Sequence, residues 1–238
     1  PNTPLTALKV AELSNEAGFP PGVINVVSGH AEAGSYLTTH PKVDKVAFTG
    51  STKVGMEIVK GSHGHNLKRV TLELGGKSPN IITAHADLDT AVNQSSMALF
   101  FNMGQCCIAG SRTFVHSSIY DKYIARLGEK LAGIRVGDGF DPESTLGPVV
   151  NKDQFAKIMS YIEHGKKEGA KVVHGGKRHG DRGYFVQPTL FADVKDHMII
   201  AKEEIFGPVM SVLKYDTTDE VIERANSTHY GLGAGLVT

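Results

Sequence analysis

The chain has 238 residues, of which 40% are hydrophobic and 21% are charged, so it can bury one large core or two modest ones. Lysine plus arginine and aspartate plus glutamate both number 25, so no net electrostatic field favours nucleic acid or an anionic membrane surface as a partner. The sequence has no apolar run long enough to cross a membrane, and its first residues do not resemble a signal peptide. These features indicate a globular protein whose partners must be inferred from its sites.

The first third of the chain alternates between helix and strand patterns. Thr3 is the expected N-cap of the first helix, Pro4 its first residue and Gly18 its end. In chain order we expect a helix over 2–18, a strand over 22–27, a helix over 31–40, a strand over 43–50, a helix over 51–61 and strands over 69–74 and 79–83. Strands separated by crossover helices indicate a parallel sheet in an α/β fold.

The rest of the chain continues the same alternation, with Asn151 as the expected cap of a long helix. We expect helices over 87–104, 117–134, 151–169 and 218–227, strands over 112–116 and 210–215, and a Gly-rich turn or hairpin over 174–191. A second α/β layer therefore follows the first. The glycine pair after Leu74 suggests a domain boundary there, which divides the chain into residues 1–75 and 76–238.

Both cysteines of the chain are adjacent, in "GQCCIAG". A disulfide between neighbours closes a small strained ring and stabilises little. A metal site is not indicated, because no suitably spaced cysteine or histidine accompanies the pair. Cys106 and Cys107 are therefore either two buried small residues or one buried thiol beside a reactive one.

Two other stretches carry possible sites. In "VAFTGSTKVG" a strand runs into Gly50 and Ser51 before a helix opens, which is a location suited to a phosphate group. The alternative is an ordinary turn capped by Ser51 or Thr52, since neither common phosphate-loop pattern is present. In "VTLELGG" the carboxylate of Glu73 lies within an apolar strand, so it is either exposed or held near a site where a raised pKa is useful.

These stretches, together with "AKEEIFGPVMSVL", resemble the aldehyde dehydrogenase superfamily, and most closely its NAD-dependent hydrolytic branch acting on aliphatic or retinoid-type aldehydes. The resemblance covers essentially the whole chain and keeps four motifs in the family's order. It implies a partial Rossmann-like dinucleotide-binding domain over 1–75, followed by an α/β catalytic domain over 76–238 that is truncated at its C-terminus.

The resemblance also assigns roles to individual residues. Cys107 matches the nucleophile and Glu73 the general base that activates water, so water rather than coenzyme A is the expected acyl acceptor. Gly50 and Ser51 match the cofactor pyrophosphate loop, Leu74 and Gly75 line the nicotinamide side, Glu204 and Phe206 match the ribose and nicotinamide contacts, and Cys106 lines the substrate tunnel with Phe101 and Ile108.

The implied function is oxidation of a small-molecule aldehyde to a carboxylic acid, with NAD as cofactor and NADP left open. The family's ribose-binding lysine and the asparagine that completes its oxyanion hole would precede Pro1, and its subunit-pairing strand would follow Thr238. We therefore expect an internal piece of a longer, homo-oligomeric enzyme of the cytoplasm or mitochondrial matrix, with the piece itself inactive. The alternatives are a catalytically silent fragment or, with less support, a thiol hydrolase that needs no nucleotide.

Overall fold

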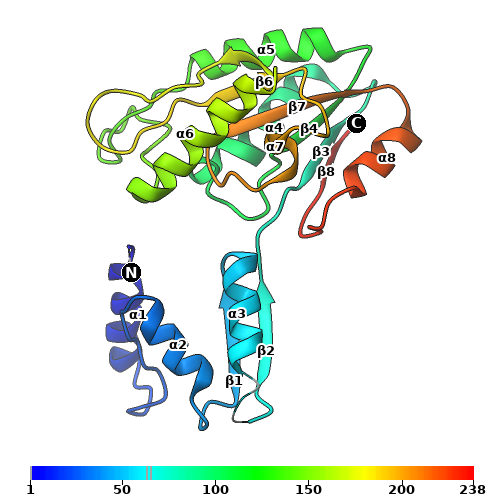
Figure 1. The fold of residues 1–238 in the computed structure, drawn as a ribbon. Helices are drawn as coiled ribbons and strands as arrows, with labels where there is room; N and C mark the ends of the chain where they lie inside the picture. Colours follow the sequence, from blue (N-terminus) through cyan, green and yellow to red (C-terminus); the bar gives the residue numbers. More distant parts are fainter. Residues whose placement is uncertain (1, 63, 65) are drawn as a thin grey trace. The chain divides into compact units, whose positions relative to one another are not determined.

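A computed structural model describes residues 2–62, 64 and 66–238 (Figure 1). It divides into two compact units, Pro1–Leu74 and Gly75–Thr238. The division falls within the glycine-containing stretch where the sequence suggests a domain boundary. None of the helices in the described part of the chain is long and apolar enough to cross a membrane.

The first unit contains a parallel β–α–β arrangement preceded by two helices. Its elements are α1 (Leu5–Glu16), α2 (Ala31–Thr39), β1 (Lys45–Thr49), α3 (Thr52–Ser62) and β2 (Arg69–Glu73). β1 and β2 pair in parallel, with Lys45 opposite Arg69 and Thr49 opposite Glu73. The parallel pairing joined by a helix agrees with the α/β fold expected from the sequence.

The predicted strand over 22–27 is wrong. Those residues form a turn followed by irregular backbone, and Val23 and Val27 are 61% and 75% exposed. Gly22 has a φ of 84°, directly after two prolines that cannot donate backbone hydrogen bonds. A β-branched run forms a strand only where a neighbouring strand pairs with its backbone, and the described sheet of this unit consists of β1 and β2 alone.

The second unit is a six-stranded sheet with helices on both faces. Its strand order is β5-β6-β7-β4-β3-β8, and every neighbouring pair is parallel except β5 with β6. The elements are β3 (Pro79–Ile82), α4 (Leu88–Phe100), a 3-10 turn η1 (Phe101–Gly104), β4 (Arg112–His116), α5 (Tyr120–Ala132), α6 (Lys152–Lys167), β5 (Lys171–His174), β6 (Thr189–Ala192), α7 (Ile199–Lys202), β7 (Val209–Tyr215), α8 (Thr218–Asn226) and β8 (Gly235–Val237). Of the turn or hairpin expected from the Gly-rich stretch, the antiparallel β5–β6 pair shows the hairpin.

Two hydrophobic clusters cover the two faces of this sheet. Alternate residues of β4 divide between them: Phe114 belongs to the cluster beneath α6 and α7, and Val115 to the cluster beneath α4 and α5. Leu127 of α5 and Ile162 of α6 are fully buried, one in each cluster. Strands buried on both faces form a rigid support for the loops at their ends.

Candidate active site

The two cysteines lie on a tightly shaped loop between α4 and β4. Asn102 and Met103 have left-handed backbones, with φ of 48° and 56°, and Gly104 follows with a φ of 70°. A Cβ on Gly104 would overlap the carbonyl oxygen of Gly207, so this position accepts only glycine. Non-glycine residues in this region cost about 1–3 kcal/mol each, and such backbones cluster at functional sites.

Further hydrogen bonds hold the loop in place. Asn102 Nδ2 donates to the carbonyl of Gln105 at 2.9 Å, and Gln105 Oε1 accepts from the backbone N–H of Val150 at 2.9 Å. Both thiols are free and partly buried. Cys106 packs against the hydrophobic cluster beneath α4 and α5. The loop therefore fixes the backbone that carries both thiols.

Gly76 connects Cys107 with Glu204. A Cβ on Gly76 would overlap the carbonyl oxygen of Cys107, so the two backbones are in close contact. The N–H of Gly76 donates to Glu204 Oε1 at 3.1 Å. The other carboxylate oxygen, Oε2, occupies the space that a Cβ on Gly75 would need. The structure thus brings together Gly75, Cys107 and Glu204, which the sequence separates widely.

Phe206 lies on the turn between α7 and β7, where its φ of 57° is unusual for an aromatic residue. Gln154, in the first turn of α6, donates from Nε2 to the carbonyl oxygens of Ile205 and Phe206, at 3.0 and 2.7 Å. Phe206, Glu204 and Cys106 line one small cavity together with Gly76. Two contacts that the resemblance assigns to the cofactor therefore lie beside the thiol loop.

The turn after β1 has the geometry of a helix-terminus anion site. The chain passes from β1 through Gly50 and exposed Ser51 into α3, where the N–H of Val54 donates to Ser51 Oγ at 3.4 Å. Gly50 N–H donates to the carbonyl of Glu73 at 3.0 Å, which joins the ends of the two strands. The first N–H groups of α3 and its positive dipole end suit a pyrophosphate. Ser51 also fulfils the capping role of the simpler alternative.

Glu73 is the last residue of β2, and its side chain is exposed. Of the two alternatives for this carboxylate, the structure therefore has the exposed one. Leu74, which follows it, packs on α3: a Cβ on Gly55 would lie 2.8 Å from Leu74 Cδ2. The division between the two units separates Leu74 from Gly75, so the two predicted nicotinamide-side residues belong to different units.

The predicted substrate residues Phe101, Cys106 and Ile108 do not line one common cavity among those described. Phe101 and Ile108 are 60% and 59% exposed. Phe101 lines a shallow pocket with Met97 and Met103, whereas Ile108 packs near Gly233. Their exposure leaves them free to meet a substrate, and their role stays a prediction.

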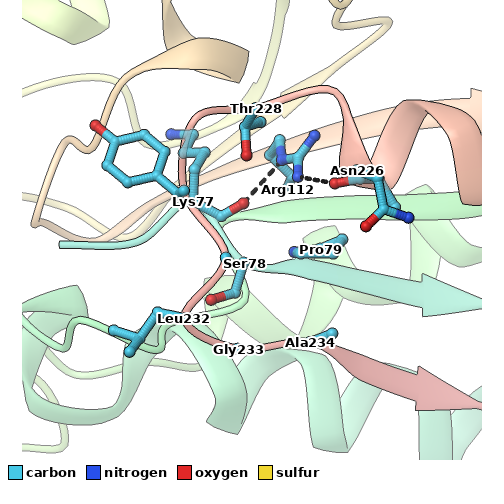
Figure 2. Close-up of a pocket in the computed structure, with 12 residues that line it drawn as sticks. Lys77, Ser78, Pro79, Arg112, Asn226, Thr228, Leu232, Gly233 and Ala234 are labelled. Carbon is cyan, nitrogen blue, oxygen red and sulfur yellow. Dashed lines mark hydrogen bonds between the residues drawn. The ribbon is translucent and has the colours of Figure 1, made fainter. Parts of the chain in front are cut away.

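A separate pocket of about 320 Å³ lies at the start of β3. Figure 2 shows its polar side, where Arg112 Nε donates to the carbonyl of Lys77 at 2.9 Å. Lys77 is 1% exposed, and burial, followed by the charge of Arg112, lowers the pKa of its amino group to about 7. Within the described residues, the Nζ atom of Lys77 and the Oγ atom of Ser78 have no hydrogen-bond partner. Neither cysteine lines this pocket.

Several residues that shape the site were missed by sequence reasoning. The "GGK" run was a signal for Gly76, because a second glycine beside Gly75 indicates close approach of another backbone. Lys77 directly follows this pair. Gln154 gives no such signal, since nothing in its helical segment distinguishes it from a solvent-facing glutamine. Among the residues that the structure describes, no group of three or more His, Cys, Asp or Glu side chains could hold a metal ion.

Comparison with known proteins shows extensive similarity. The family model described as "Aldehyde dehydrogenase family" matches residues 1–238. The chain is 57% identical over 237 residues to the enzymes named "Aldehyde dehydrogenase, mitochondrial" of Mesocricetus auratus and Homo sapiens, covering 99% of this chain and 47% and 46% of theirs. The chain thus spans about half the length of the curated relatives it matches.

Solved structures agree with this similarity. An NAD+ complex of aldehyde dehydrogenase from Bacillus cereus has a TM-score of 0.97 and 51% identity, and the match covers 99% of this chain and 48% of that one. Betaine aldehyde dehydrogenase from Staphylococcus aureus, a double mutant in complex with NAD+ and with a BME-modified cysteine, has a TM-score of 0.94 and 40% identity over the same shares. Since the family match spans the full chain and the fold follows it closely, this chain belongs to the aldehyde dehydrogenase family.

Proposed function

We propose that the protein oxidises an aldehyde to a carboxylic acid, with Cys107 as the nucleophile and NAD+ as the cofactor. The observation that carries the proposal is the meeting at Gly76, whose Cα closely approaches the Cys107 carbonyl while its N–H binds Glu204. One glycine therefore holds the nucleophile's backbone and a carboxylate suited to sugar hydroxyls in fixed positions. Family membership and the NAD+ complexes of similar enzymes support the cofactor.

The residues present suit a dinucleotide. The Gly50–Ser51 turn offers helix N–H groups to the pyrophosphate. The Glu204 carboxylate, with Oε2 over Gly75, can accept hydrogen bonds from the nicotinamide ribose. Phe206 supplies an apolar ring for the nicotinamide, and Leu74 and Gly75 are assigned to the same side. The chemistry that NAD+ supplies when bound is acceptance of a hydride from the substrate carbon.

Cys107 performs the covalent chemistry. Its thiolate sulfur adds to the aldehyde carbon, which forms a thiohemiacetal whose oxygen carries the developing negative charge. The family resemblance assigns the backbone N–H of Cys107 to the stabilisation of that oxygen. Once the carbon has been oxidised, the acyl group remains on Cys107 as a thioester, and sulfur is a good leaving group for its hydrolysis.

Glu73 acts as the general base. Its carboxylate takes a proton from water, the hydroxyl adds to the thioester carbon, and the carboxylic acid leaves as the thiolate of Cys107 is restored. Exposure of the Glu73 side chain gives it access to water. Cys106, Phe101 and Ile108 would line the path of the aldehyde. Similarity to enzymes named mitochondrial supports the mitochondrion over the cytoplasm as the compartment. The homo-oligomeric state rests on the family resemblance.

The test compares two cysteine variants of the protein in its natural full length. Cys107→Ser should lower NAD-dependent oxidation of acetaldehyde by about a thousandfold or more, since a hydroxyl is a far weaker nucleophile at neutral pH. Cys106→Ser is the matched control and should keep most of the activity. Iodoacetamide should label Cys107 well before Cys106. Equal labelling, or full turnover by Cys107→Ser, would contradict the assignment, and a wild type without turnover would favour a catalytically silent member of the family.

A further inference from the structure

Gln105 lies two positions before Cys107, and the proposed chemistry gives it no role. Its side chain reaches out of the loop, because Oε1 accepts from the backbone N–H of Val150 at 2.9 Å. Its main chain bonds within the loop: the N–H donates to the carbonyl of Asn102 at 3.0 Å, and the carbonyl accepts from Asn102 Nδ2 at 2.9 Å. Gln105 therefore joins the thiol loop to the segment that precedes α6.

The thiol loop needs contacts that fix its orientation, because its backbone is strained. Asn102 and Met103 have left-handed backbones, which persist in residues other than glycine only where surrounding contacts determine them. Met103 and Cys106 pack against the buried cluster beneath α4 and α5, but apolar contact is non-directional. A hydrogen bond fixes direction as well as distance. The contact between Gln105 and Val150 therefore determines how the loop is oriented.

Val150 is a fixed point to which the loop can be attached. The residue before it, Val149, is 3% exposed and donates from its N–H to the carbonyl of Tyr184 at 3.0 Å. The residue after it, Asn151, caps α6, a helix with a buried face. The Gln105 side chain thus binds a backbone that is held on both sides.

The start of α6 also holds the turn that carries Phe206. Gln154, in the first turn of the helix, donates to the carbonyl oxygens of Ile205 and Phe206. The loop of the proposed nucleophile and the turn of the proposed nicotinamide contact are therefore both attached to residues 150–154. A common rigid support keeps reacting groups at a constant separation.

We propose that Gln105 is a positioning residue for Cys107: its side-chain hydrogen bond to Val150 fixes the thiol loop on the start of α6, and with it the distance from the thiol sulfur to the nicotinamide. This inference rests on the proposed function, in which Cys107 is the nucleophile. Without the Gln105 acceptor, the N–H of Val150 can bond to water, because Val150 is 45% exposed. The loop is then free to shift, and a shift of about 1 Å between reacting groups can lower turnover by about a hundredfold.

The test compares substitutions of Gln105 in the protein of natural full length, with acetaldehyde and NAD+ as substrates and active thiols counted by iodoacetamide. Gln105→Met keeps the length of the side chain but loses the acceptor. Its kcat per active thiol should fall by about ten- to a hundredfold, while the dissociation constant of NAD+ changes by less than about twofold. Gln105→Leu should show the same loss, so that a folding failure of one variant still leaves a test. Gln105→Glu keeps an acceptor oxygen for the N–H of Val150 and should recover most of kcat. The matched control is Gln94→Met, at an exposed glutamine of α4, which should turn over as the wild type does.

Labelling of the two thiols separates positioning from a general loss of stability. In Gln105→Met, the preference of iodoacetamide for Cys107 over Cys106 should fall by about threefold or more, because a loosened loop exposes the thiol that packs against the core. A merely structural glutamine would lower the unfolding temperature of the variants. It would change neither kcat per active thiol nor the labelling preference.

The outcomes distinguish this inference from the proposed function. If Cys107→Ser keeps full turnover, or if the wild type has none, the proposed function fails, and the role of Gln105 fails with it. If Cys107→Ser loses turnover but Gln105→Met and Gln105→Leu keep it, the inference about Gln105 alone is overturned. Equal losses in Gln105→Met and Gln105→Glu would also overturn it, since the acceptor oxygen would then make no difference.

Discussion

Both units place a helix between parallel strands, and they differ in what packs against those strands. In β7 of the second unit, six residues are buried, and only Lys214 is exposed. In β1 of the first unit, residues alternate between exposed and partly buried. Both hydrophobic clusters formed by described residues lie in the second unit. Regular elements thus form by local rules in both units, whereas a core requires a sheet covered on both faces.

The proposed chemistry divides along the same line. Cys107, Glu204 and Phe206 belong to the unit with the buried sheet, where the loops are fixed by close backbone contacts. Gly50, Ser51 and Glu73 belong to the unit whose residues are mostly exposed. Precise positions for bond-making groups need rigid support. A phosphate turn needs only a strand end and a helix start, which the first unit provides locally.

The largest expected effect concerns stability. Leu127→Ala, in α5, should lower the free energy of unfolding by about 2–5 kcal/mol, because Leu127 is fully buried. Leu5→Ala, the same change on α1 at 77% exposure, should change it by less than about 0.5 kcal/mol. Urea unfolding followed by circular dichroism measures both. If Leu5→Ala lowered the free energy of unfolding as much as Leu127→Ala does, α1 would be buried in solution, and the two units would not differ in burial as described.

The next prediction tests whether the first unit, whose residues are mostly exposed, supplies a catalytic group. Glu73→Gln keeps the size of the side chain but removes its basicity, so turnover should fall by about a hundredfold or more. NAD+ affinity should change little, because Glu73 is not proposed to contact the cofactor. Steady-state rates and a fluorescence titration check the two parts. Glu57→Gln, an exposed carboxylate on α3 of the same unit, serves as the control, and normal turnover of Glu73→Gln would remove Glu73 from the mechanism.

A third prediction concerns the pH dependence of stability, which a buried titratable side chain of the second unit causes. Burial lowers the pKa of Lys77 to about 7, so between about pH 7 and pH 10.5 the unfolded chain keeps a proton that the folded chain has lost. Stability from this group therefore rises with pH across that window, at up to about 1.4 kcal/mol per pH unit; as the pH falls it is lost progressively from about pH 10.5, and the loss is complete once the pH has passed below 7. Lys77→Met should remove this rise. Urea unfolding of the two proteins at several pH values from 6 to 9 measures the difference. If the free energy of unfolding changes equally with pH in both proteins, the lowered pKa of Lys77 is contradicted.

The sequence predicts helices and strands better than it predicts contacts between residues that are distant in the chain. Periodicity and end signals locate most of the helices and strands, because these elements are specified by residues close together in the chain. The short α7 and β8 were not predicted. The strand over 22–27 was wrong because its formation depends on a partner strand that local sequence does not encode. For the same reason, the close contact of Gly76 with Cys107 and the hydrogen bonds from Gln154 to the Phe206 turn could not be predicted. They join residues more than thirty positions apart in the chain.

The smallest expected effect compares the helix starts of the two units. The sequence predicts caps at Thr3 and Asn151, and the outcomes differ. Asn151 Oδ1 accepts from the N–H of Gln154 at 2.8 Å, whereas α1 begins at Leu5 after Pro4, without a side-chain capping bond. The prediction for Thr3 was therefore wrong by one residue, and the prediction for Asn151 is confirmed.

Asn151→Ala should accordingly lower the free energy of unfolding by about 1 kcal/mol, the usual cost of a lost N-cap, and Thr3→Ala by less than about 0.5 kcal/mol. Asn151→Ser, which keeps a capping oxygen, should restore most of the loss, and thermal unfolding of the three variants measures it. Because the capped residue Gln154 also holds the Ile205 and Phe206 carbonyls, Asn151→Ala should additionally weaken NAD+ binding, whereas Thr3→Ala should not. Equal costs at the two positions would show that helix starts in both units are held alike, and that the units differ only in their cores.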